Sequence, residues 1–118
     1  MVAEQGSIRN PVGLEKLKSG ENFPGWSTRF KSMMMIIDSQ YEALFEHFED
    51  KSKFNRPIVD EDFKKSDGTI HEQNFKLSKN LKFYIVNYCD YNLDVILNAE
   101  STSHGFELWR RLRDRFDH

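Results

Sequence analysis

This chain has 118 residues, the length of one ordinary domain, with a net charge of −2 and a mean hydropathy of −0.70. The near-balanced charge argues against a nucleic-acid-binding domain, which shows a basic excess. No apolar run approaches the roughly 20 residues that span a bilayer, so no membrane partner is expected. The single cysteine, Cys89, cannot form an internal disulfide, and the chain starts without a basic-then-apolar leader pattern. These features predict an intracellular protein of a reducing compartment.

Residues 1–19 are predicted to form a partly mobile N-terminal arm, because glycine and proline residues interrupt any long element there. Its few apolar side chains end with Leu14 and Leu17, near which we expect the arm to be tied down. The folded domain is therefore expected to occupy residues 20–118.

The stretch from Gly20 to Ile37 is the one around which the rest of the chain is organised. Pro24 fits a first helical turn, where its missing N–H costs nothing, and Asn22 is a plausible cap just before it. Four large apolar side chains follow at spacings of four, three and four residues, which places them on one helix face and predicts core residues: Trp26, Phe30, Met33 and Ile37.

A second helix is predicted over about residues 39–48, because the apolar stripe continues there after a break at Asp38 and Ser39. Acidic side chains near a helix C-terminus are unfavourable for the helix dipole, so they indicate a solvated face rather than a catalytic cluster. The outer side of this helix carries three of them: Glu42, Glu46 and Glu49.

Residues 51–70 are predicted to form an irregular connection, with a proline, an acidic run at 60–62 and an Asp-Gly turn signal. Residues 58–59 and 69–70 are candidates to pair as a very short hairpin. The acidic run lacks the alternating ligands and the glycine of a calcium loop, so we expect it to be solvated.

The helical period returns at His71 and predicts a helix of about seventeen residues, with Leu81 and Ile85 among its inward side chains. A short helix is then expected within residues 90–97, and Ser103 is expected to cap a final helix. The inward face of that last helix carries Trp109, Leu112 and Phe116. Its outer face carries Arg110, Arg111, Arg113 and Arg115. The periodicity predicts an all-α fold class, a compact bundle of about five helices.

Two motifs in a fixed order give the chain a family resemblance. The first is an opening of the form Gly-x-Asn-Phe-x-x-Trp at residues 20–26, and the second is Leu-Trp-x-x-Leu-x-x-x-Phe at residues 108–116, about eighty residues later. The pair resembles the Gag polyprotein of copia-type LTR retrotransposons, over about residues 14–116. The chain departs from the family pattern at residues 54–69, and at Phe75, where the family often has Trp.

The resemblance implies a fold like that of the retroviral capsid N-terminal domain and a structural role as a capsid (Gag) domain. Such a domain self-associates weakly, with its own copies and with other Gag domains, to build a cytoplasmic virus-like particle around RNA. RNA contact by this piece is expected to be indirect, because a CCHC zinc knuckle carries much of it in the family. Gypsy-type Gag and the neuronal Arc protein share related helical domains. The alternative is therefore an Arc-like adaptor that binds linear peptides in an inter-helix groove.

The residues themselves also indicate a structural protein rather than an enzyme. There is no glycine-rich phosphate loop, Ser103 and His104 are chain neighbours rather than parts of a triad, and the histidines lack metal-binding spacing. We therefore expect no catalytic site, no cofactor and no metal.

The oppositely charged outer faces of the second and the last helix are the candidate assembly surface. Direct RNA contact by the arginine face is the weaker interpretation, since Glu107, Asp114 and Asp117 partly neutralise it. The full candidate surface is formed by Glu42, Glu46, Glu49, Arg110, Arg111, Arg113 and Arg115.

Overall fold

The computed structural model describes residues 10–90, 92–93 and 98–116 of the chain. These residues contain four α-helices and two short 3-10 turns, and none of them belongs to a β-strand. In chain order the elements are α1 (Phe23–Ile37), α2 (Gln40–Phe48), η2 (Asp60–Phe63), α3 (Glu72–Asn87), η3 (Ala99–Ser101) and α5 (Gly105–Phe116). The predicted all-α class is confirmed, whereas the short helix predicted within residues 90–97 falls mostly outside the described residues.

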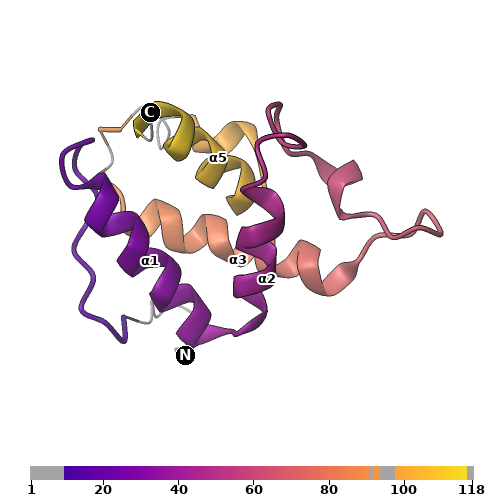
Figure 1. The fold of residues 1–118 in the computed structure, drawn as a ribbon, viewed down its shortest axis with the longest axis horizontal. Helices are drawn as coiled ribbons and strands as arrows, with labels where there is room; N and C mark the ends of the chain where they lie inside the picture. The colour runs from indigo at the N-terminus through magenta and orange to yellow at the C-terminus, as the bar shows by residue number, and fades with distance from the viewer. Residues whose placement is uncertain (1–9, 91, 94–97, 117–118) are drawn as a thin grey trace.

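The helices pack in two close pairs, α3 with α5 and α1 with α2. Figure 1 shows α2 crossing in front of α3, with α1 beside it. The Tyr41 hydroxyl donates a hydrogen bond of 2.6 Å to the carbonyl oxygen of Leu77, which ties α2 to α3. At the start of α5, a Cβ atom on Gly105 would lie only 2.3 Å from the backbone nitrogen of Lys82. The absence of a side chain at this position is therefore what lets α5 approach α3 so closely.

The core is rich in stacked aromatic rings. Trp26 stacks on Phe30 with ring centroids 4.8 Å apart, and Phe30 stacks on Trp109 at 5.5 Å. Such pairs contribute about 0.5–1.5 kcal/mol each beyond the area they bury. Among the residues predicted to face inward, Ile37 and Phe116 are partly buried. The others are buried: Trp26, Phe30, Met33, Leu81, Ile85, Trp109 and Leu112.

The extended segment before α1 is attached to the C-terminal end of α3. The backbone N–H of Leu17 donates to the carbonyl oxygen of Tyr88, and the N–H of Asp90 donates to that of Leu17, both at 2.8 Å. These two bonds make a parallel bridge between Leu17 and Cys89. Leu14 and Leu17 are both buried, so this part of the predicted arm belongs to the core.

The starts of α1 and α5 differ in detail from the predicted caps. The predicted cap at Ser103 is wrong, because α5 begins at Gly105 and its N-cap position is therefore His104. The side chain of Asn22 precedes α1 but makes no capping bond to it. Its Oδ1 instead accepts from the backbone N–H groups of residues 18–19, at 3.1 Å each, and closes the turn before the helix.

The connection between α2 and α3 is held by specific contacts. The expected pairing of residues 58–59 with residues 69–70 is wrong, because the antiparallel bridge joins Lys64 to Ile70 instead. The backbone N–H of His71 also donates to the carbonyl oxygen of Phe63 at 2.7 Å. Pairing therefore starts after η2, where the Asp-Gly turn brings the chain back.

The sequence predicted that the acidic run at 60–62 is solvated. The run instead forms η2, and one of its carboxylates is bound within the chain. The Arg56 guanidinium donates to both carboxylate oxygens of Asp62, at 2.9 and 2.7 Å. These bonds, together with a backbone bond from Val59, lower the pKa of Asp62. The run therefore helps to fix the conformation of the connection itself.

Candidate functional site

The two sequence motifs meet in space and form one packed aromatic cluster. A Cβ atom on Gly20 would lie 3.0 Å from the Phe116 ring, so the first residue of the first motif lies against the last residue of the second. The ring centroid of Phe23 lies 5.6 Å from that of Phe116 and 6.5 Å from that of Trp109. The rings of Trp26 and Trp109 are 6.1 Å apart. We call this arrangement the motif cluster.

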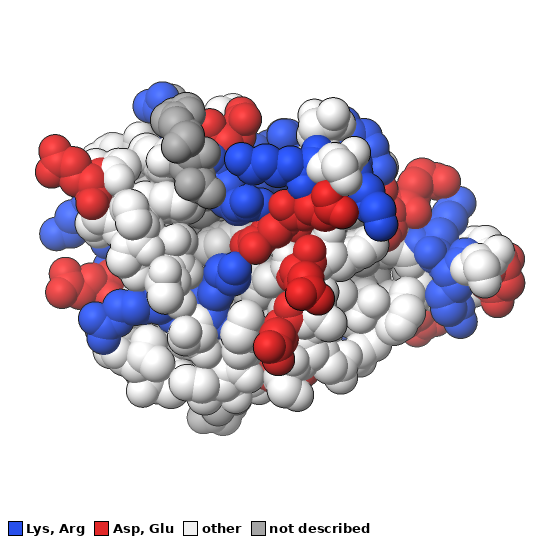
Figure 2. Space-filling view, in the orientation of Figure 1, with Lys and Arg blue, Asp and Glu red and all other residues white. Residues whose placement is uncertain are grey.

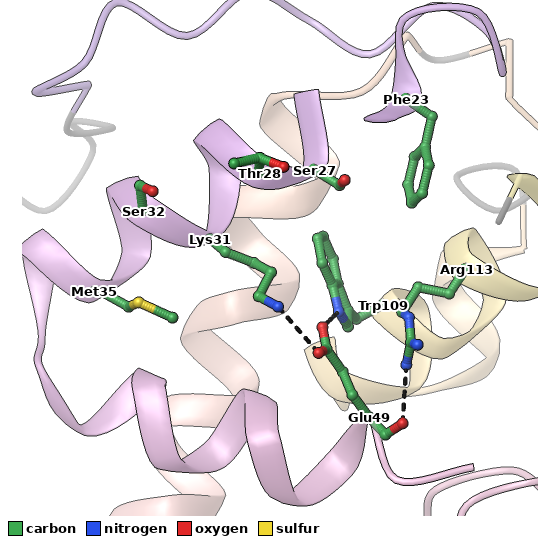
Figure 3. A pocket seen from close by; sticks show the side chains of 9 residues that line it. All are labelled: Phe23, Ser27, Thr28, Lys31, Ser32, Met35, Glu49, Trp109 and Arg113. Carbon is green, nitrogen blue, oxygen red and sulfur yellow. Dashed lines mark hydrogen bonds and ion pairs between the residues drawn. The ribbon is translucent and has the colours of Figure 1, made fainter. Parts of the chain in front are cut away.

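Glu49 connects three elements beside the motif cluster. Its carboxylate accepts a 2.7 Å hydrogen bond from Trp109 Nε1 and pairs with Lys31 Nζ at 3.0 Å, while its backbone carbonyl accepts from Arg113 at 3.2 Å (Figure 3). Glu49 was predicted to lie on the solvated face of α2. The structure places it instead at the C-cap of α2, where α1, α2 and α5 converge, with its side chain only 20% exposed.

A groove runs on both sides of the contact between Glu49 and Arg113, and we call it the Trp109 groove. It consists of two pockets of about 310 and 360 Å³ that share these two residues. Figure 3 shows the first pocket, with Lys31 and Met35 reaching from α1 and Trp109 reaching from α5. The lining of this first pocket combines apolar, hydroxyl-bearing and charged side chains, Lys31 and Glu49 among the charged ones.

Most of the arginine face of α5 is engaged within the chain. Arg110 donates twice to the Glu107 carboxylate, and Arg111 donates once to it, all at 2.9 Å. Arg111 also donates to the carbonyl oxygen of Asn98 at 3.0 Å. Arg115 is exposed, with its guanidinium carbon 5.7 Å from the centre of the Phe116 ring. Over much of its length, the predicted arginine surface is therefore engaged in hydrogen bonds and ion pairs within the chain.

Glu107 is a buried structural carboxylate whose role the sequence did not predict. It was predicted only to neutralise the arginines, but it is buried and also accepts a 2.8 Å hydrogen bond from the backbone N–H of Ile58. Burial opposes ionisation of this carboxyl group. Hydrogen bonds from Arg110, from Ile58 and from Arg111 outweigh that effect and lower its pKa. Glu107 therefore fastens the α2–α3 connection to α5.

A second buried polar contact holds η2 to the start of α5. His104 is buried, with Nε2 2.6 Å from Asp60 Oδ1 and Nδ1 3.3 Å from the Ser78 hydroxyl. Its ring stacks on Phe63 at 4.5 Å. The Ser78 side chain is fully buried. The arrangement links α3, η2 and α5.

The acidic half of the candidate assembly surface is open. Glu42 and Glu46 are exposed on the outer side of α2, and neither pairs with a cation among the described residues. Figure 2 shows acidic side chains over α2 directly below basic side chains near α5. The two halves of the predicted surface meet where Arg113 donates to the Glu49 carbonyl oxygen at 3.2 Å.

Comparison with known proteins gives no significant match to a family model, to a curated protein or to a solved structure. None of the described helices is both long enough and apolar enough to cross a membrane. Within the described part of the chain, no three His, Cys, Asp or Glu side chains are grouped to hold a metal ion.

Proposed function

We propose that this chain is a structural capsid domain of the Gag type, from an LTR retrotransposon or a domesticated Gag. In this proposal it self-associates to build a cytoplasmic virus-like particle around RNA. The observation that carries the proposal is the motif cluster. Gly20 lies against Phe116 and Trp26 lies against Trp109, although about eighty residues separate the two motifs. A motif pair that joins the first helix to the last defines the shape of a domain, which supports a structural role.

The outer faces suit a protein that assembles through many weak contacts. Strong contacts would trap errors in a growing shell, whereas complementary charges set the register of a contact more than its affinity. The exposed glutamates of α2 supply such a charged face. In the proposed particle the partners are other copies and other Gag domains, and RNA is contacted only indirectly.

Assembly on a surface tests this proposal. The chain, tethered by a C-terminal histidine tag to a nickel-chelating lipid monolayer, reaches the high local concentration that a shell would provide. Negative-stain electron microscopy is expected to show ordered arrays with a regular repeat. A dense but disordered layer would contradict a capsid role.

A second candidate function, an adaptor that binds a linear peptide, is favoured by the Trp109 groove. The groove is lined by Phe23 and the partly buried Met35, which suit an apolar side chain, beside the ion pair of Lys31 with Glu49. Peptides selected from a random display library are expected to bind the unmodified chain and to lose binding to Ser32→Arg, which narrows the groove. If no selected peptide is sensitive to this substitution, the adaptor function is rejected.

A further inference from the structure

A stripe of apolar and basic side chains lies on the side of α3 that faces away from the core. Phe83 and Val86 are exposed there over 47% and 36% of their surface. Lys76 and Lys79 are exposed on the same side, because spacings of three and four residues share one helix face. We call these four residues the α3 stripe. Glu72, one turn before Lys76, ends the basic part of this face.

The acidic side of α2 lies on a different surface of the molecule. We call Glu42, Ala43 and Glu46, which are all exposed, the α2 stripe. Both helices turn their buried faces towards one common core, and Figure 1 shows α2 nearer to the viewer than α3. Figure 2, in the same orientation, shows the acidic side chains over α2 facing the viewer. The α3 stripe therefore points away from the α2 stripe, across the core.

The basic partner of the α2 stripe is more readily found on α3 than on α5. Arg110 and Arg111 already bind Glu107, and Arg113 donates to the Glu49 carbonyl oxygen. The lysines of the α3 stripe are exposed and form no ion pair among the described residues, although Lys79 Nζ lies 4.7 Å from the centre of the Phe75 ring. They stand beside apolar side chains that an interface would bury.

We propose that the α3 stripe of one copy docks on the α2 stripe of a second copy. This contact rests on the proposed capsid function and names the surfaces by which its copies join. The two lysines meet Glu42 and Glu46, and Phe83, one turn beyond Lys79, packs beside this charged contact and against Ala43. Opposite charge fixes the register, and the apolar end of the α3 stripe excludes water from its part of the contact.

The position and size of the stripes determine what this contact builds. The two stripes lie on different surfaces, so a copy that binds through one stripe keeps the other available. Each bound pair therefore has one unbound α2 stripe and one unbound α3 stripe. The contact is heterologous, so it extends into rings or open arrays instead of stopping at a dimer. The α3 stripe is about 15 Å long at 1.5 Å per residue. A contact of that length buries less than about 1,200 Å², which is typical of transient association.

Charge reversal on each stripe tests the contact by sedimentation velocity over a series of protein concentrations. Glu42→Lys with Glu46→Lys, or Lys76→Glu with Lys79→Glu, should each weaken self-association by about tenfold or more, which corresponds to about 1.4 kcal/mol. An equimolar mixture of the two variants should regain it, because each reversed stripe then meets an opposite one.

Two controls separate the docking effect from unfolding and from net charge. Lys53→Glu with Lys65→Glu changes the net charge as the α3 variant does, but at exposed positions outside both stripes, and should leave association unchanged. Phe83→Ser should weaken association several-fold while the urea midpoint stays close to that of the unmodified chain, because the ring is exposed.

Each result discriminates between the proposals. Association that survives in both charge-reversed variants, or a mixture that fails to regain it, overturns the α2–α3 contact. If only the α2 variant loses self-association, the α2 stripe binds a surface other than the α3 stripe, and the proposed contact is again overturned. If the unmodified chain neither associates in solution nor forms arrays on the monolayer, the proposed function itself fails.

Discussion

Trp109 donates a 2.7 Å hydrogen bond from its indole nitrogen to Glu49 Oε2, and this bond joins α5 to the C-terminal end of α2. Trp26 lies beside it, with ring centroids 6.1 Å apart. The indole nitrogen of Trp26 is buried and has no hydrogen-bond partner among the described residues. The two tryptophans therefore share one cluster but differ in their polar contribution to it.

Replacing each tryptophan by phenylalanine should expose that difference. Trp109→Phe removes a hydrogen bond to a carboxylate and should lower the free energy of unfolding by about 1–3 kcal/mol through that loss alone. Trp26→Phe removes a donor without a partner, so it should cost less. Urea unfolding of both variants measures the difference, and equal losses would contradict the role assigned to Glu49. Truncation to alanine at either position should cost about 3–5 kcal/mol.

Gly105→Ala is expected to destabilise the domain. The added Cβ would lie 2.3 Å from the backbone nitrogen of Lys82 and 2.5 Å from Leu81 Cβ, so α5 would have to move away from α3. Such overpacking costs about 1–3 kcal/mol. Gly25→Ala is the matched control within α1, because a Cβ there meets nothing within 4 Å and alanine favours helix by about 0.5–1 kcal/mol. Thermal unfolding should move the two Tm values in opposite directions.

Glu107→Gln should make the free energy of unfolding less dependent on pH. Because the folded-state pKa of Glu107 is lowered, its carboxylate stabilises the fold above the ordinary carboxyl pKa of about 4.3. That contribution is lost as the pH falls through the lowered folded-state pKa. The variant should be less stable than the unmodified chain near neutral pH and should show a flatter decline below about pH 4.

The matched control for that prediction is Glu46→Gln, at an exposed position on α2. Its unfolding free energy should stay within about 0.5 kcal/mol of the unmodified chain at neutral pH. If Glu107→Gln behaves like Glu46→Gln, the carboxylate of Glu107 does not stabilise the contact with Ile58.

Cys89 should resist thiol reagents in the folded protein. Its side chain is buried, and burial raises the pKa of the thiol to about 12. The reactive thiolate is therefore scarce at about pH 8, where an exposed cysteine reacts readily. Labelling with a chromogenic disulfide should be slow in buffer and fast in denaturing urea. Rapid labelling in buffer would contradict this prediction. It would show that the bridge between Leu17 and Cys89 opens often enough to expose the thiol.

The helices were predictable because burial of one face leaves a regular trace in the sequence. The spacing from Trp26 to Met33 identified the buried face of α1 without knowledge of its neighbours. The start of α5 was not predictable in this way. Ser103 has suitable capping chemistry, but the helix starts where Gly105 fits against α3, and that requirement belongs to the tertiary structure.

The candidate site was less predictable, because charge patterns do not reveal which charges are paired. Glu107 lies between Phe106 and Leu108, both buried, and its partners three and four residues later are a recognisable helical signal. Its bond to Ile58 joins positions far apart in the chain and has no local signal. Glu49 differs from Glu46 for the same reason, since only the fold brings Trp109 to it.

The contact between Trp26 and Trp109 also bears on how long the folded state lasts. It closes a loop of about eighty residues, and the entropic cost of closure rises with the logarithm of loop length. We expect the docking of α1 on α5 to come late in folding, after α3 and α5 have paired. Interactions absent from the transition state control the unfolding rate and not the folding rate. The aromatic rings that join the two ends of the domain would then determine its lifetime once folded, while the speed of folding depends on the helices between them.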